Sequence, residues 1–312
     1  MVLLLQYTLI FASVLILVAL GGCFAEHSGV INLGLEGIMI MGALGGALAM
    51  RYISPNVPAI VMILGVLAIS ALVGMIYSCL LAVACINFKA DQTLVGTALN
   101  LLGTAGATVI VKAINTAANP DDVSSIVQYA GAKKAFTVNL GSFEFSWFML
   151  VTALLLAASY VLLYKTRFGL RLRACGEHPQ AADSVGINVY RMRYAGVLIS
   201  GFLGGVGGLA YVIPSVQTWN FEVGVAGTGF LALAVMIFGQ WKPFHIFGAA
   251  MFFAVFKSLA NIADSTFLAQ LHWSSNIYNM MPFVASMVIL AFTSKNSMAP
   301  KAEGIPYDKG SR

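Results

Sequence analysis

Long apolar runs separated by short polar links fill this chain from one end to the other. A helix needs about 20 apolar residues to cross a bilayer, and roughly nine runs approach that length. They cover residues 3–22, 29–50, 57–87, 93–115, 146–164, 194–213, 225–240, 244–262 and 277–293. The sequence therefore predicts an all-α fold, a polytopic transmembrane helical bundle of about nine to ten spans with broken helices.

Composition excludes the soluble classes. Only 9% of the residues are charged and 59% are hydrophobic, whereas soluble domains carry roughly 25% charged residues. The nucleotide-binding pattern GxxxxGK[ST] does not occur in the sequence, so ATP-driven work would need another chain. We expect one membrane domain over residues 1–312, with no enzymatic activity and no cofactor in this chain. We also expect no metal site, because no Cys and His spacing matches a zinc motif.

One polar loop, residues 165–193, interrupts the apolar pattern and holds six of the 17 Lys and Arg residues. At its centre, the segment PQAADSV predicts a very short helix. Pro179 suits the first helical position, where its missing N–H would be unpaired anyway. Gly186 suits the stop, because glycine adopts a left-handed backbone without steric cost. Such a helix is well placed to contact a cytoplasmic partner.

The charges also predict the orientation. Basic residues gather on the cytoplasmic side of membrane proteins. Loop 165–193, the C-terminal residues 294–312 and the links at 89–91 and 241–243 then lie inside, and link 116–145 lies outside. This places the N-terminus outside and the C-terminus in the cytoplasm. The net charge of +5 is explained by these loops, so we expect a lipid membrane and no nucleic acid as partner.

Two segments are irregular. Residues 28–43 place Asn32 and Glu36 among glycines within an apolar run, and residues 219–239 place polar and glycine-rich residues, Thr228 among them, before a short one. Each is typical of a helix that starts at membrane depth with N–H groups facing a cavity. An acid there is costly and should face protein or water. Glu36 either shapes a substrate pathway or braces a broken helix through nearby N–H groups.

Other polar residues add candidates for the same pathway. Lys257 either pairs with Glu36 or Glu222, or extends its long stem toward a surface. Asn100 either lines a polar path or bonds between helices. Gln217, Trp219 and Asn220 combine aromatic and amide groups that suit a nucleobase or a sugar, or form an interfacial aromatic belt. The segment GFLGGVGG at 201–208 predicts a close helix contact.

The motifs together resemble a family. The segments SGVINLGLEGIMIMGA, TRFGLRLRACGEHPQAADSVGINVYRMR and GVAGTGFLALAVMIFGQWKPF are similar to permease subunits of bacterial ABC importers, in the branch for simple sugars, branched-chain amino acids and nucleosides. The resemblance spans nearly the whole chain. It is closest to the nucleoside permeases.

This resemblance implies an ATP-driven importer of the bacterial plasma membrane that works by alternating access. The loop 165–193 would carry a coupling helix that docks on a separate ATP-binding subunit, where ATP and magnesium bind. The implied docking residues are Glu177, Pro179, Ala181, Ala182, Asp183 and Gly186. A second permease, different but related, and an extracytoplasmic substrate-binding lipoprotein complete the implied assembly, which carries a small-molecule substrate.

Three alternatives remain at this point. The chain could carry a simple sugar or another small solute as a permease of the same branch. It could be a secondary carrier driven by an ion gradient, with Glu36 as the coupling site. It could be a membrane enzyme, although the sequence shows no arrangement of a nucleophile with a base.

Overall fold

A computed structural model describes residues 2–54, 57–129, 135–141, 143–214, 218–262, 275–293 and 298–310. Its helices are α1 (Val2–His27), α2 (Leu35–Tyr52), α3 (Ala59–Ala82), α4 (Gln92–Ala118), α6 (Trp147–Lys165), α7 (Arg167–Glu177), α8 (Pro179–Ser184), α9 (Val189–Val212), α10 (Thr228–Phe238), α11 (Pro243–Ile262) and α12 (Ser275–Thr293). A π-helical segment (Val83–Asn87) continues α3, and a 3-10 turn (Phe221–Val223) precedes α10.

The helical bundle confirms the predicted fold class. Within the described residues, six helices are long and apolar enough to cross a membrane: α1, α3 with its π-helical extension, α4, α6, α9 and α11. The predicted long run at 57–87 is one continuous segment of 29 residues, Ala59–Asn87. The run at 225–240 differs from a full span. Its helix α10 has only 11 residues, about 16 Å of length against a hydrocarbon core of about 30 Å.

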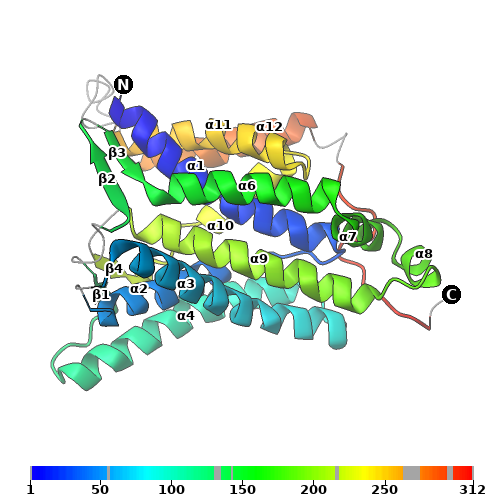
Figure 1. The fold of residues 1–312 in the computed structure, drawn as a ribbon, viewed down its shortest axis with the longest axis horizontal. Helices are drawn as coiled ribbons and strands as arrows, with labels where there is room; N and C mark the ends of the chain where they lie inside the picture. The colour runs from blue at the N-terminus through cyan, green and yellow to red at the C-terminus, as the bar shows by residue number, and fades with distance from the viewer. Residues whose placement is uncertain are drawn as a thin grey trace.

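Helix α9 lies at the centre of the bundle and packs against α1, α2 and α3 (Figure 1). The predicted close contact at 201–208 is confirmed there. A Cβ atom added to Gly42 of α2 would lie 2.3 Å from the Cα atom of Gly205 in α9. Because no side chain fits between these backbones, the two helices approach more closely than larger residues allow.

Four short strands lie at the end of the molecule that holds the N-terminus, which we call the strand end (Figure 1). Strand β1 (Ile126–Gln128) pairs antiparallel with β4 (Thr218–Asn220), and β2 (Thr137–Leu140) pairs with β3 (Phe143–Ser146). The sequence analysis did not predict these strands. Each has only three or four residues, too few to produce a readable alternation of polar and apolar positions.

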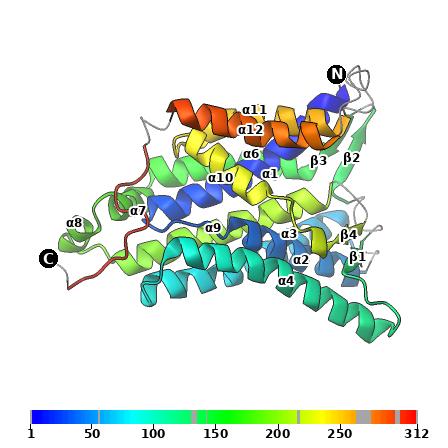
Figure 2. The same ribbon diagram turned by 180° about the vertical axis from the view of Figure 1, so that it is seen from behind.

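The opposite end, which we call the α8 end, holds α7, α8 and the chain's C-terminus (Figure 2). Seen from behind, α4, α10 and α12 lie toward the viewer. The link after α10 and the turn after α3 lie at the same end, because Gln240 bonds Met298 and Lys89 pairs with Asp308 at 3.0 Å. The four segments predicted to share one side of the membrane therefore share one end of the bundle.

Candidate functional site

The two predicted irregular segments meet at Glu36. Residues 28–34 form turns and irregular backbone before α2 starts at Leu35, and Gly227, with φ +72°, precedes α10. The carboxylate of Glu36 accepts hydrogen bonds from the backbone N–H groups of Gly227 and Gly229, both at 2.8 Å. We call this contact the α2–α10 junction. Of the two roles predicted for Glu36, the structure contains the brace.

The chemistry of the junction follows from helix electrostatics. The first N–H groups of a helix have no intrahelical partner, and the helix dipole favours a negative charge beside them. Glu36 satisfies two such donors with its two oxygens. A Cβ atom on Gly229 would lie 2.7 Å from the Cα atom of Glu36, so a residue larger than glycine would force the two helices apart.

Two predicted pathway residues hold the backbone before and within the first turn of α2. Asn32 is fully buried, donates to Ser200 Oγ at 2.8 Å and accepts from the N–H of Gly34. Asn100 of α4 accepts from the N–H of Gly37 at 2.8 Å and donates to the Leu33 carbonyl. Both amides are therefore braces between helices, which is the second of the roles considered for Asn100.

The polar residues around the start of α10 form a second group. Thr228 is buried, and its side chain forms a hydrogen bond with that of Tyr211. The Tyr211 ring packs edge-on against the Trp219 ring, with 5.6 Å between the ring centroids. Asn220 turns toward strand β1, where its Oδ1 accepts from Ser125 Oγ at 2.7 Å. Glu36, Thr228 and Trp219 are thus brought to one region by Tyr211, whereas Gln217 lies outside the described residues.

Of the two roles considered for Lys257, the described part of the structure does not contain the ion pair. Glu222 pairs with Lys112 at 2.6 Å, and both oxygens of Glu36 are occupied by backbone N–H groups. Lys257 is half-buried in α11. Among the described residues no ion pair joins Lys257 to either acid, which agrees with a stem extended toward a surface.

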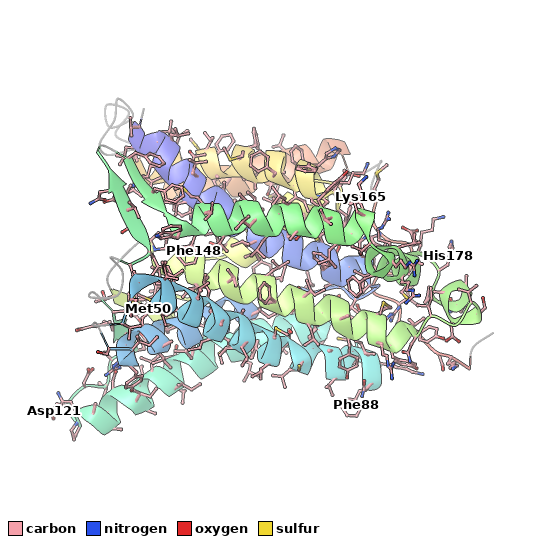
Figure 3. The ribbon with its side chains drawn as sticks, viewed as in Figure 1. Met50, Phe88, Asp121, Phe148, Lys165 and His178 are labelled. Atoms are coloured by element: carbon pink, nitrogen blue, oxygen red, sulfur yellow. The ribbon has the colours of Figure 1, made fainter. Side chains whose placement is uncertain are left out.

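The basic loop folds as predicted around a very short helix. Pro179 is the first residue of α8 and Gly186, with φ +84°, follows it. The neighbouring helices have their own caps, since Thr166 Oγ1 accepts from Gly169 N–H and Asn188 Oδ1 accepts from Arg191 N–H. Lys165 and His178 lie at this end of the molecule, whereas Met50 and Asp121 lie at the strand end (Figure 3).

The six predicted docking residues divide by exposure. Glu177, Ala181 and Gly186 are exposed, Asp183 is half-buried, and Pro179 and Ala182 are buried. Ala182 is 4% exposed and packs against Cys175, Val189 and Tyr307. Ala182, one of the implied docking residues, therefore faces its own chain. The exposed face of this turn consists of Gln180, Ala181, Ser184 and Val185.

Several contacts at the α8 end escaped the sequence analysis. Glu26, at the end of α1, is buried and its Oε2 accepts from the indole N–H of Trp241 at 2.5 Å. Its carboxyl also faces that of Glu303. An acid at the end of an apolar run was the available signal for Glu26. Its partners come from distant parts of the sequence, which no local pattern reveals.

A polar pocket of about 360 Å³ lies at the strand end and was also not predicted. It is lined by Arg51, Asn115, Asp122, Ser124, Ile126 and Gln128. Arg51 donates to Asn115 Oδ1 at 2.6 Å, and Asn115 in turn donates to the carbonyls of Ser124 and Ile126. Most of its polar groups therefore hold the pocket's own wall together.

Comparison with known proteins identifies relatives over the whole chain. Residues 4–291 match the family described as branched-chain amino acid transport system / permease component. The guanosine ABC transporter permease protein NupQ of Bacillus subtilis is 40% identical, over 98% of this chain and 96% of its own length. The nucleoside ABC transporter permease protein NupC of Lactococcus lactis is 36% identical, over 96% and 95%. A putative glucose ABC transporter permease of Haloferax volcanii, TsgC13, is 31% identical, over 85% and 79%.

Proposed function

Because the chain belongs to the family of branched-chain amino acid transport system permease components, we propose that it is the membrane subunit of a nucleoside importer. As an ABC transporter permease it is a transport subunit without an ATPase site, and ATP binds a separate subunit. The observation that carries the nucleoside assignment is the near full-length similarity to NupQ and NupC, whose names specify guanosine and nucleosides.

The alternative substrate is a simple sugar or another small solute. The putative glucose permease of Haloferax volcanii supports it, at lower identity and lower coverage. The two substrates differ in chemistry, since a nucleoside adds a flat aromatic base to a sugar. Trp219 and Tyr211, packed edge-on near Thr228, offer aromatic surface for such a base.

The proposed pathway runs past the α2–α10 junction. We propose that Trp219 and Thr228 face this pathway and that Asn32, Glu36 and Asn100 brace its wall. Asn220 and Gln217 stay predictions from the sequence. Glu36 fixes the start of α10 against α2, so a change in the distance between these helices must break or re-form its two hydrogen bonds. Alternating access requires a contact that can be either formed or broken, and we propose that these two hydrogen bonds are such a contact.

We assign loop 165–193 to the cytoplasm, together with the C-terminus, and the N-terminus to the outside of a bacterial plasma membrane. The gathering of the four basic segments at the α8 end supports this orientation, because cytoplasmic loops carry the excess of Lys and Arg. The proposed unit is a single transmembrane domain over residues 1–312, with the coupling loop within it.

An ABC permease works with an ATPase subunit and a substrate-binding protein. We propose that the ATPase contacts the exposed face of α8 around Ala181 and Val185. Val185 is 75% exposed at the tip of the loop, a position where an apolar side chain gains by being covered. A second, related permease and an extracytoplasmic lipoprotein would complete the assembly.

Co-purification tests this docking face. The full chain is expressed with its ATPase subunit, and the amount of ATPase retained is measured for Val185→Asp and Ala181→Arg. Both variants should lose at least about tenfold of the retained ATPase, because a charge or a bulky side chain replaces a small apolar contact. Val123→Asp, a similarly exposed valine just before strand β1, is the matched control. Undiminished retention in Val185→Asp and Ala181→Arg would overturn the assignment.

Guanosine uptake tests the function itself. In proteoliposomes that hold the assembled complex, uptake should require ATP on the side of the ATPase and should be unaffected when ion gradients are collapsed. An ion-coupled carrier gives the opposite result. The structure already argues against Glu36 as an ion-coupling acid, since both its oxygens accept backbone hydrogen bonds. Competition by free glucose, without competition by nucleosides, would favour the sugar alternative.

A further inference from the structure

The described C-terminal residues 298–310, which we call the C-terminal tail, run back across the α8 end of the bundle. The N–H of Met298 donates to Gln240 Oε1 in the link after α10, at 3.0 Å. The N–H of Ala302 donates to the carbonyl of Gly176 at the end of α7, at 2.8 Å. The tail thus has backbone bonds to two separate parts of the bundle, which a freely solvated end would not form.

Tyr307 joins the tail to the proposed coupling helix. It is 4% exposed and packs with Ala182 of α8, Cys175 of α7 and Val189 of α9. Its side chain also bonds that of Asp183. Two of the six residues predicted to dock on a partner, Ala182 and Asp183, therefore contact the tail instead.

Arg193 fixes the tail from the side of α9. Its guanidinium is 1% exposed and donates to the Ile305 carbonyl at 3.0 Å, and it lies 6.0 Å from the Tyr307 ring. A buried cation without acceptors is costly. Arg193 therefore favours the docked position of the tail, in which that carbonyl covers it.

The tail also lies on the segment that leads to the α2–α10 junction. Gly304 has φ +75°, and a Cβ atom there would lie 2.8 Å from Ile31 Cδ1. The N–H of Ile31 donates to Gln92 Oε1 at 2.6 Å. Ile31 is only five residues before Glu36. The tail therefore contacts the segment of backbone that leads to this acid.

The C-terminal tail also contacts α1 through a pair of acids, Glu26 and Glu303. Glu26, 5% exposed, faces the carboxyl of Glu303 in the tail. Two facing carboxylates repel each other unless they share a proton. Burial raises the pKa of Glu303 above its ordinary value. Protonation of this pair therefore favours the contact between the tail and α1.

We propose that the C-terminal tail is a tie between the coupling helix and the α2–α10 junction, with Tyr307 and Glu303 as its positioning residues. The tie runs from α8 through Tyr307 to Gly304 and Ile31, and it is held to α1 by the Glu26–Glu303 pair. Movement of α8 then reaches Glu36 without passing along a whole membrane span. This inference rests on the proposed docking of α8 to an ATPase subunit.

The tie has a defined pH dependence. A carboxyl whose pKa is raised on docking stabilises the docked state below its ordinary pKa, and this contribution is lost as pH rises through the raised value. Docking should therefore weaken from mildly acidic toward alkaline pH. The other titratable or charged groups near the pair are Cys23 and His27 of α1, Arg173 of α7 and Arg193 of α9. The variant Glu303→Gln removes the titration of the acid pair and leaves the neighbouring groups in place. Any pH dependence that persists in this variant therefore comes from those groups.

The experiment measures guanosine uptake and ATP hydrolysis together, in the reconstituted complex of the full chain. Tyr307→Ala should retain its ATPase subunit and hydrolyse ATP, but transport per ATP should fall roughly tenfold, within the usual 5- to 150-fold range of coupling between sites. Tyr307→Phe keeps the ring and should fall much less. Tyr52→Ala, an exposed tyrosine at the strand end, is the matched control.

The pH profile of transport per ATP supplies the second readout. In the wild-type complex the ratio should decline as pH rises above the ordinary pKa of a glutamate and through the raised pKa of Glu303. Glu303→Gln should flatten this profile, because its amide donates to Glu26 without a shared proton. Glu222→Gln, an exposed acid paired with Lys112, should keep the wild-type profile. An unchanged ratio in Tyr307→Ala, or identical profiles for the wild type and Glu303→Gln, would overturn the tie.

The proposed function fails in a different way. If α8 does not dock on the ATPase, Val185→Asp retains the subunit fully, whatever the tail variants do. If docking is correct and the tie is wrong, Val185→Asp loses the subunit while Tyr307→Ala transports normally.

Discussion

Glu36 and Glu26 are both acids in apolar helices, yet their carboxyls contact opposite kinds of group. Glu36 lies at the start of α2, where its two oxygens accept N–H groups from the start of α10. Glu26 lies at the end of α1, where one oxygen accepts from Trp241 and the carboxyl faces Glu303. A helix N-terminus stabilises a charge, whereas a second acid demands a proton. The first contact can hold a fixed charge, and the second responds to pH.

Replacing Glu36 should have the largest effect, because two hydrogen bonds to a charged acceptor are lost. Each such bond contributes about 1.5–3 kcal/mol. Glu36→Ala should lower guanosine uptake by at least about tenfold, and Glu36→Gln should also fail, because its amide N–H₂ would face a backbone N–H. Uptake is measured in proteoliposomes, with ATPase retention as the control for assembly. Normal uptake in Glu36→Ala would show that the α2–α10 junction is not needed.

Replacing Trp241 should have an intermediate effect, because one hydrogen bond to Glu26 is lost. Trp241→Phe should lower stability by about 1–3 kcal/mol, because the buried Glu26 oxygen is left without its donor. The Trp241 carbonyl, which contacts Cys23 and His27, remains in place. Thermal unfolding in detergent measures the change, with Trp147→Phe at the strand end as the control. Equal midpoints for the two variants would contradict the assigned role of the indole.

Removing the exposed pair should have the smallest effect. Lys112 and Glu222 lie 2.6 Å apart, but their side chains are 42% and 49% exposed. Exposed pairs contribute about 0–1 kcal/mol. Lys112→Ala should therefore leave thermal stability and uptake close to wild type. A loss of thermal stability as large as that of Trp241→Phe would contradict the claim that the exposed Glu222 contact contributes less than the buried Glu26 contact.

The sequence was sufficient for the features that depend on neighbouring residues. Apolar runs predicted the bundle, Pro179 and Gly186 predicted the limits of α8, and glycines around Glu36 predicted a broken helix. The glycines at 201–208 predicted a close helix contact, which the structure contains. In each case the physical cause, such as a missing N–H or a missing Cβ, acts within a few residues of the signal.

The features it did not predict depend on contacts between distant residues. Nothing near Glu26 in the sequence indicates that Glu303 will face it, and nothing near Ala182 indicates that Tyr307 will cover it. The burial of Ala182 was not predicted for this reason, because the tail that covers one side of α8 comes from a distant part of the sequence. The partner of Glu222 was likewise decided by the fold.

The simultaneous measurement of ATP hydrolysis and guanosine uptake in Val185→Asp and Glu36→Ala complexes tests the central claim most directly. The claim is that the α8 end receives the ATPase and the α2–α10 junction controls the substrate pathway. Val185→Asp should lose the ATPase subunit and both activities. Glu36→Ala should retain the subunit and hydrolyse ATP while uptake collapses. Wild-type uptake in either variant, or loss of the ATPase subunit from Glu36→Ala, would contradict this division between the two ends.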